Sequence, residues 1–253
     1  AMLSAICGNA TIWKPSPKGV LCCVAVQNII NEALGDNYPP IFSSIMEVGN
    51  THAKAMVDDR RIHLISFTGS CEIGLQVGAK VAARAGKSLL ELGGNNAMII
   101  DASADLKLAV PAVVFGAVGT AGQRCTSTRR LFVHNNIIDE VCQTLTAAYQ
   151  QVRIGDPLHP DTLMGPLTDE TAVERFLVAI EQAQQVGGKL LSGGERLDRD
   201  GFFVSPALIR AENDWDIVQQ ETFAPILYVI GFDEPDQAIA MQNNVRQGLS
   251  SAI

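Results

Sequence analysis

The fold class is decided by the stretch Ile62-His63-Leu64-Ile65-Ser66-Phe67-Thr68-Gly69-Ser70. Its apolar part, Ile62–Phe67, predicts a strand, and the segment from Ser70 to Arg84 predicts a helix. Another strand is expected at Ser88–Leu92. A strand, a helix and a strand in succession form the unit from which parallel sheets are built. The stretch therefore predicts an α/β fold.

The same alternation continues on both sides of this stretch. The first 92 residues predict one parallel, Rossmann-like nucleotide-binding sheet, incomplete, with helices on both faces. The further strands are expected at Ala10–Lys14, Ile41–Glu47, Ala97–Asp101, Arg130–His134, Lys189–Ser192, Phe202–Leu208 and Ile226–Phe232. The further helices are expected at Gly19–Leu34, Thr51–Asp58, Leu106–Val118, Ile137–Val152 and Ala172–Val186. We place a boundary at Gly93-Gly94, which gives two α/β domains, 1–92 and 93–253.

Composition narrows the possible functions. Of the 253 residues, 47% are hydrophobic and 18% charged, which is typical of a soluble globular protein. A net charge of −8 argues against a nucleic-acid or anionic-membrane surface. The six cysteines and four histidines form no metal-ligand spacing, and the adjacent Cys22 and Cys23 make a poor disulfide framework. We therefore expect no metal and a reducing, cytoplasmic location.

One cysteine stands in a setting that suits a nucleophile. Cys125 lies in the loop Gly119-Thr120-Ala121-Gly122-Gln123-Arg124-Cys125-Thr126, between an apolar helix and a strand. A thiol in such a small-residue loop can be reached by a substrate, and the flanking Arg124 favours the thiolate, which is the reactive form. The alternative, an inert and half-buried thiol, is the more frequent one for a lone cysteine.

Two further segments accompany this loop. Upstream lies Glu91-Leu92-Gly93-Gly94, and downstream lies Gln220-Glu221-Thr222-Phe223-Ala224-Pro225. In this order and spacing, the three segments resemble the aldehyde dehydrogenase superfamily, and the match runs through nearly the whole chain. The stretches 91–97, 119–130 and 221–229 are most similar to its α-aminoadipic semialdehyde (piperideine-6-carboxylate) dehydrogenase, or antiquitin, branch.

The resemblance implies a reaction. It is the NAD(P)-dependent oxidation of an aldehyde, here α-aminoadipic semialdehyde, to the carboxylate through a thiohemiacetal and a thioester on Cys125. Glu91 would be the general base for the deacylating water, and desolvation at the end of an apolar strand would suit that role. The alternative for Glu91 is a carboxylate that faces solvent.

The resemblance also implies how a nucleotide is held. NAD is expected, and NADP is not excluded, because Pro17 stands where many relatives carry a glutamate that would repel a 2′-phosphate. A strand–glycine–helix turn aims backbone N–H groups at a phosphate, although taken alone it is more often a plain helix start. The residues that the resemblance assigns to the nucleotide are Lys14, Gly69, Ser70, Gly93, Glu221 and Phe223.

Arg124 has two interpretations that we rate equally. It would bind the carboxylate at the far end of the substrate, or it would hold the loop. The family supplies an oxyanion donor from an asparagine that lies upstream of the Lys14 strand, and the chain has no such segment. We therefore expect an internal fragment of a homo-oligomeric enzyme, truncated at both ends, with a non-catalytic remnant as the alternative. A cysteine hydrolase that uses His134 is a weaker possibility.

Overall fold

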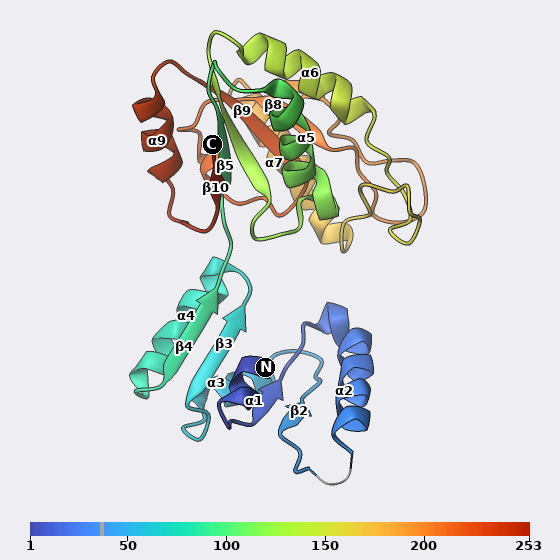
Figure 1. Cartoon of the computed structure of the whole chain (residues 1–253), viewed down its shortest axis with the longest axis vertical. Coiled ribbons are helices and arrows are strands. Elements are labelled where there is room, and N and C mark those ends of the chain that lie inside the picture. Colours follow the sequence, from blue (N-terminus) through green and yellow to red (C-terminus); the bar gives the residue numbers. More distant parts are fainter. Residues whose placement is uncertain (36–37) are drawn as a thin grey trace. The chain divides into compact units, whose positions relative to one another are not determined.

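The structure is a computed structural model that describes residues 1–35 and 38–253. The chain divides into two compact units, Ala1–Glu91 and Leu92–Ile253, and each is described by itself (Figure 1). Within the described residues, every helix is either too short or too polar to cross a bilayer.

The first unit alternates short strands with helices, as the sequence predicts. Its helix α3 spans Thr51–Asp58, as expected, whereas the strand expected at Ile41–Glu47 is shorter. Its elements are α1 Met2–Ile6, β1 Thr11–Trp13, α2 Val20–Leu34, β2 Phe42–Ser44, α3 Thr51–Asp58, β3 Leu64–Thr68, α4 Cys71–Ala83 and β4 Lys87–Glu91.

The expectation of one continuous sheet in this unit is wrong. Strand β1 pairs with β2 and strand β3 pairs with β4, both in parallel, as two separate two-stranded sheets. Strands β1 and β2 have three residues each, so their pairing closes only a few ladder bonds. Hydrophobic alternation identifies strands but does not specify which strands pair, since pairing depends on long-range packing.

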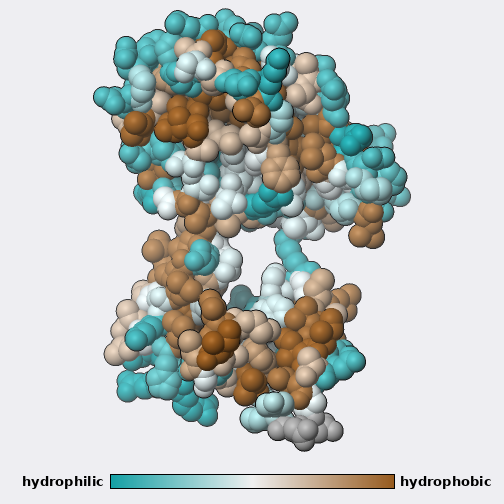
Figure 2. Space-filling view, in the orientation of Figure 1, coloured by the Kyte–Doolittle hydropathy of each residue, from teal (hydrophilic) through white to brown (hydrophobic). Residues whose placement is uncertain are grey.

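The first unit has a small apolar core. Its buried cluster consists of Ile65, Val77 and Val81, with four partly buried side chains packed against it. Other large apolar side chains are exposed, among them Leu21 at 85% and Leu75 at 68%. Figure 2 accordingly displays apolar residues over the face of this unit that is turned to the viewer. Little of the free energy that holds this unit together comes from a shared core of its own.

The second unit is built on a six-stranded sheet. The strand order is β10-β5-β6-β9-β8-β7, and every neighbouring pair is parallel except β7 with β8. The predicted α/β fold is therefore confirmed. The elements are β5 Asn96–Ile100, α5 Leu106–Val118, β6 Thr128–His134, α6 Ile138–Gln150, α7 Glu170–Gln185, β7 Lys189–Ser192, β8 Ala207–Arg210, α8 Asp216–Gln219, β9 Ile226–Phe232, α9 Pro235–Asn243 and β10 Ser251–Ala252.

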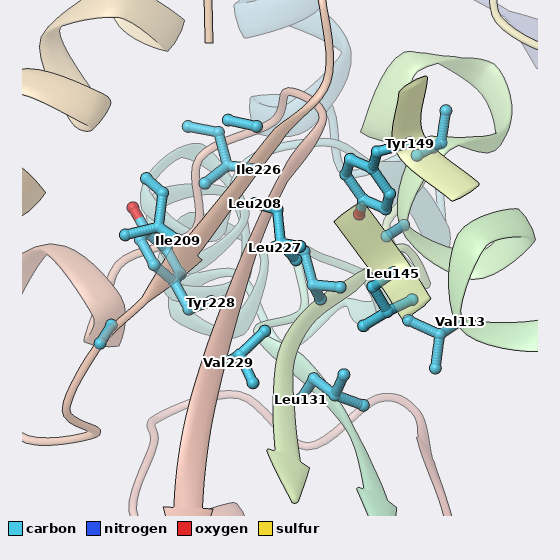
Figure 3. Packing of buried hydrophobic residues seen from close by; sticks show 14 of the residues in the cluster. Val113, Leu131, Leu145, Tyr149, Leu208, Ile209, Ile226, Leu227, Tyr228 and Val229 are labelled. Atoms are coloured by element: carbon cyan, nitrogen blue, oxygen red, sulfur yellow. The ribbon is translucent and has the colours of Figure 1, made fainter. Parts of the chain in front are cut away.

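The core of the second unit lies on its central strands. Strand β6 is buried up to its last residue, as expected for a strand covered on both faces. Helices α5 and α6 pack against one another and on the sheet, while α9 lies away from them against β5 and β9 (Figure 1). Figure 3 shows Leu227 of β9 close to Leu145 and Tyr149 of α6, in one cluster. This packing gives the strand ends a rigid base.

Three elements in the last fifty residues differ from the expected pattern. The strand predicted at Phe202–Leu208 is displaced, because β8 begins only at Ala207. Pro206 has no N–H to donate to a ladder, and Val204 forms just an isolated bridge with Arg196. Helix α9, which opens with Pro235 at its first turn, and the two-residue strand β10 were not predicted.

Candidate active site around Cys125

Three predicted segments meet at one edge of the six-stranded sheet. Gly93-Gly94 precedes β5, Arg124-Cys125 precedes β6, and Glu221 with Phe223 precedes β9. Strands β5, β6 and β9 are parallel neighbours, so their amino ends lie at the same edge. The fold of the second unit thus brings together residues that are far apart in the sequence.

The loop that carries Cys125 begins with an unusual backbone. Thr120 and Ala121 both have φ of 53°, and Gly122 follows with φ of 65°. A non-glycine residue in this left-handed region costs of order 1–3 kcal/mol, so the surrounding structure must hold it. Gly122 packs so closely on the next segment that a Cβ there would lie 2.3 Å from the carbonyl oxygen of Ala224. The run turns the chain sharply from α5 toward β6.

The peptide groups around Cys125 are held by side chains. The carbonyl of Cys125 accepts a hydrogen bond of 2.7 Å from Asn96 Nδ2, which also donates to Ser127 O at 2.9 Å. Asn96 Oδ1 accepts from the N–H of Ser250 at 3.1 Å. Within the described part of the chain, the N–H of Cys125 itself donates to no protein atom. A half-buried thiol thus stands beside a backbone donor that can serve an oxyanion.

Arg129 binds all three segments at once, and sequence reasoning missed it. Its side chain is 3% exposed. Nε donates to Gly94 O at 3.1 Å, and Nη1 donates to Gly122 O at 3.1 Å and to Thr222 O at 2.8 Å. Nη2 donates to Arg124 O and to Glu221 Oε1, each at 3.0 Å. Burial lowers the pKa of Arg129, and the charges of Glu221 and Cys125 act against that shift.

The two glycines after Glu91 accommodate these contacts. Glu221 Oε1 accepts a hydrogen bond of 3.3 Å from the N–H of Gly94. A Cβ on Gly93 would lie 1.8 Å from Glu221 Oε2, and one on Gly94 would lie 2.6 Å from the Cys125 carbonyl oxygen. The pair therefore forms a cradle that only glycine leaves open. Phe223, which is 48% exposed, lies beside it, with the Arg129 guanidinium 5.3 Å from its ring centre.

Arg124 is directed toward helix α5. Its guanidinium carbon lies 5.0 Å from the ring centre of Phe115, a cation–π arrangement, and its backbone N–H donates to Ser127 Oγ at 3.1 Å. The arginine that sequence reasoning placed beside the thiol thus lies on an exposed phenylalanine, and the guanidinium of Arg129 is the one that hydrogen-bonds to the loop backbone.

Arg130, the residue that follows Arg129, has a structural role. It is fully buried and donates to Asn95 O at 2.8 Å, to Asn213 Oδ1 at 3.0 Å and to Met241 O at 3.0 Å. Burial lowers its pKa to about 10. These bonds fasten the end of α9 to the amino end of β5, the strand in which Asn96 lies.

The first unit places its predicted residues at the carboxyl ends of its strands. Lys14 follows β1, Gly69 and Ser70 join β3 to α4, and Glu91 is the last residue of β4. Ser70 caps α4 by accepting from the N–H of Ile73 at 3.4 Å, whereas the N–H of Gly69 donates to Glu91 O at 3.1 Å. Carboxyl ends of parallel strands are the usual location of nucleotides in such sheets.

One expectation about Glu91 is wrong. Desolvation at the end of an apolar strand is absent, because Glu91 is exposed and β4 is exposed along most of its length. Strand β4 carries apolar residues, but the two-stranded sheet to which it belongs does not cover it on both faces. In the parts of the chain that the structure describes, no three His, Cys, Asp or Glu side chains are grouped in a way that could hold a metal ion.

Comparisons with known proteins show the family to which the chain is similar. The model of the aldehyde dehydrogenase family matches residues 1–253. The α-aminoadipic semialdehyde dehydrogenase of Bos taurus is 49% identical over 253 residues, which are 99% of this chain and 47% of that protein. A putative aldehyde dehydrogenase family 7 member A1 homolog of Caenorhabditis elegans is 48% identical, over 99% of this chain and 48% of that protein.

Solved structures agree as well. A crystal structure of betaine aldehyde dehydrogenase from Staphylococcus aureus in complex with NAD+ superposes with a TM-score of 0.92 at 30% identity. The match covers 96% of this chain and 49% of that one. The chain spans about half the length of the curated relatives it matches.

Proposed function

This chain belongs to the aldehyde dehydrogenase family, and on that premise we propose that Cys125 is the nucleophile of an NAD-dependent oxidation of an aldehyde to a carboxylate. The observation that carries the proposal is the local geometry of Cys125. Its thiol is half-buried in a sharply turned loop, and its unpartnered N–H lies within backbone held by Asn96 and Arg129. The chain spans about half the length of that relative, so the activity is a proposal and is tested on the chain itself below.

The chemistry follows from the groups present. The Cys125 thiolate attacks the aldehyde carbon, and the resulting oxyanion of the thiohemiacetal accepts a hydrogen bond from the Cys125 N–H. NAD, held by the residues named below, would supply the hydride acceptor, and Cys125 would then carry a thioester. Glu91 takes a proton from the water that cleaves the thioester. The carboxylate product leaves, and the thiol is restored.

The residues assigned to NAD fit that role in different ways. Glu221 presents Oε2 in the cradle at Gly93, while its Oε1 is fixed by Arg129 and Gly94, so a carboxylate oxygen is preorganised for a ribose hydroxyl. The exposed ring of Phe223 would pack beside that ribose. In the first unit Lys14 would bind the adenosine ribose, and Gly69 and Ser70 would receive the phosphates. The Gly69 N–H already donates to the backbone carbonyl of Glu91. Gly69 would therefore let the phosphates come close to the backbone without donating a hydrogen bond to them.

For the substrate we propose α-aminoadipic semialdehyde. The support is the identity to a relative of that name and Arg124, which precedes the nucleophile in the sequence and whose half-buried side chain lies over Phe115. A guanidinium matches the geometry of a carboxylate. Six free cysteines support a reducing compartment, and we place the whole protein in the cytoplasm as a homo-oligomer.

The proposal is tested by NADH formation. The chain is mixed with NAD and α-aminoadipic semialdehyde, and reduction of the nucleotide is followed against a blank without aldehyde. We expect aldehyde-dependent NADH, and a lower kcat/KM for hexanal, which lacks the terminal amino acid group. Equal kcat/KM for the two aldehydes would contradict the substrate assignment. No NADH from either aldehyde, in folded protein at saturating nucleotide, would contradict the activity of this chain.

Nucleotide binding is expected to depend on the turn at Gly69. Replacing Gly69 with tryptophan fills the space through which the phosphates would approach, so the affinity for NAD measured by calorimetry should fall at least about tenfold. Lys87→Trp, at the opposite end of the β3–β4 pair, is the matched control and should bind as the wild type does. A circular dichroism spectrum excludes unfolding of the Gly69→Trp variant. Equal affinities in all three proteins would remove this turn from the nucleotide site.

A further inference from the structure

We infer that Arg129 is a positioning residue for the nucleophile, which fixes the direction of the Cys125 N–H. The inference rests on the proposed function, because it gives Arg129 its role through the nucleophile Cys125. Arg129 itself has no contact with substrate in this scheme. It contacts the loop through the backbone carbonyls of Gly122 and Arg124.

The guanidinium is fully engaged. All five of its N–H groups donate, four to carbonyl oxygens and one to the Glu221 carboxylate. The acceptors come from the Gly94 segment, the Cys125 loop and the Glu221 segment, so one rigid fork sets the spacing of all three. Lysine could not do this, since an ammonium has three donors and no planar fork.

The bond to Arg124 O determines where the oxyanion donor points. That carbonyl belongs to the peptide group whose N–H is that of Cys125. No peptide bond among residues 1–35 and 38–253 is cis, and in a trans peptide the C=O and N–H point in opposite directions. Because Nη2 of Arg129 holds the carbonyl at 3.0 Å, the Cys125 N–H is directed away from the guanidinium. It is left for the substrate oxygen, while Asn96 fixes the following peptide group.

This role separates two reactions of the same thiol. Acylation by an activated ester forms an oxyanion that needs the Cys125 N–H, whereas alkylation by iodoacetamide forms none. Loss of the Arg129 bond to Arg124 O should therefore slow acylation more than alkylation. A residue that only held the loop together would affect both reactions alike.

The test compares the rate at which Cys125 is acylated by an activated ester with the rate at which it is alkylated by iodoacetamide, with adducts mapped by mass spectrometry. In the wild type we expect Cys125 to be alkylated before the buried Cys23 and Cys142. Arg129→Gln should slow acylation at least about tenfold more than alkylation, because an oxyanion donor is worth about 10²–10³ in rate. Arg129→Lys should share this deficit, because an ammonium lacks the planar fork that holds the loop.

Arg153→Gln, at an exposed arginine of the same unit, is the control and should leave both rates unchanged. A folded Arg129→Gln variant with the wild-type ratio of acylation to alkylation overturns the inference. If Arg129→Gln does not fold, Arg129→Lys decides, and a wild-type ratio in that variant overturns it. Neither reaction needs aldehyde or nucleotide. Failure of aldehyde oxidation with these rate changes intact would therefore contradict the proposed function alone.

Discussion

A Cys125→Ser variant is expected to lose the burst of acyl-enzyme formation with an activated ester, by a factor of at least about 10⁴ in rate. A serine hydroxyl at this position has no general base to activate it, whereas a cysteine thiol gives its nucleophilic anion far more readily than a hydroxyl does. Glu91→Gln should keep the burst and lose turnover, by about 10²–10⁴-fold, because the amide cannot take a proton from the deacylating water. The two variants thus separate acylation from deacylation.

The measurement is stopped-flow release of the ester's leaving group, which requires no nucleotide. Glu72→Gln, at another exposed acid of the first unit, should retain both burst and turnover. A normal burst in Cys125→Ser would assign the nucleophile to another residue. Wild-type turnover in Glu91→Gln would show that Glu91 does not act in the deacylation step.

Replacing Gly122 with alanine is expected to lower the free energy of unfolding of the second unit by about 2–5 kcal/mol. The added Cβ would be held at a φ of 65° and would lie 2.3 Å from the carbonyl oxygen of Ala224. The left-handed conformation costs alanine about 1–2 kcal/mol, and crowding against backbone adds about 1–3 kcal/mol.

Urea unfolding followed by circular dichroism measures this loss. Gly248→Ala is the matched control in the same unit, because a Cβ there meets nothing within 4 Å, and its stability should stay within about 0.5 kcal/mol of the wild type. Equal unfolding midpoints for the two variants would show that the close approach of the Cys125 loop to Ala224 relaxes without cost.

The sequence predicts the fold of the second unit well, and that of the first less completely. Helices such as Thr51–Asp58 and Leu106–Val118 are found with the expected bounds, since apolar periodicity is strongest in segments of this kind. The separate sheets of the first unit could not be foreseen, because strand pairing is decided by contacts distant in sequence. The later start of strand β8 could have been predicted from Pro206, which has no N–H for a hydrogen bond between strands.

Some residues of the candidate site can be recognised in the sequence and others cannot. Cys125, Glu221 and the glycine pair stand out in the sequence because special residues occur in short motifs. Arg129 and Asn96 do not, because their roles consist of hydrogen bonds to backbone carbonyls from other segments. One signal was available. Arg129 and Arg130 lie at the start of an apolar strand, and a buried charge requires partners.

The long span of the site contacts has a consequence for how the protein folds. Gly94 and Glu221 are 127 residues apart in the chain, and Asn96 and Ser250 are 154 apart. The entropy of closing such large loops must be overcome before these bonds can form, so they belong to the late steps of folding. A collapsed intermediate would carry Cys125 without the guanidinium and amide that orient it. The thiol acquires its surroundings only when the segment that contains Ser250 has docked, which couples its reactivity to complete folding of the unit.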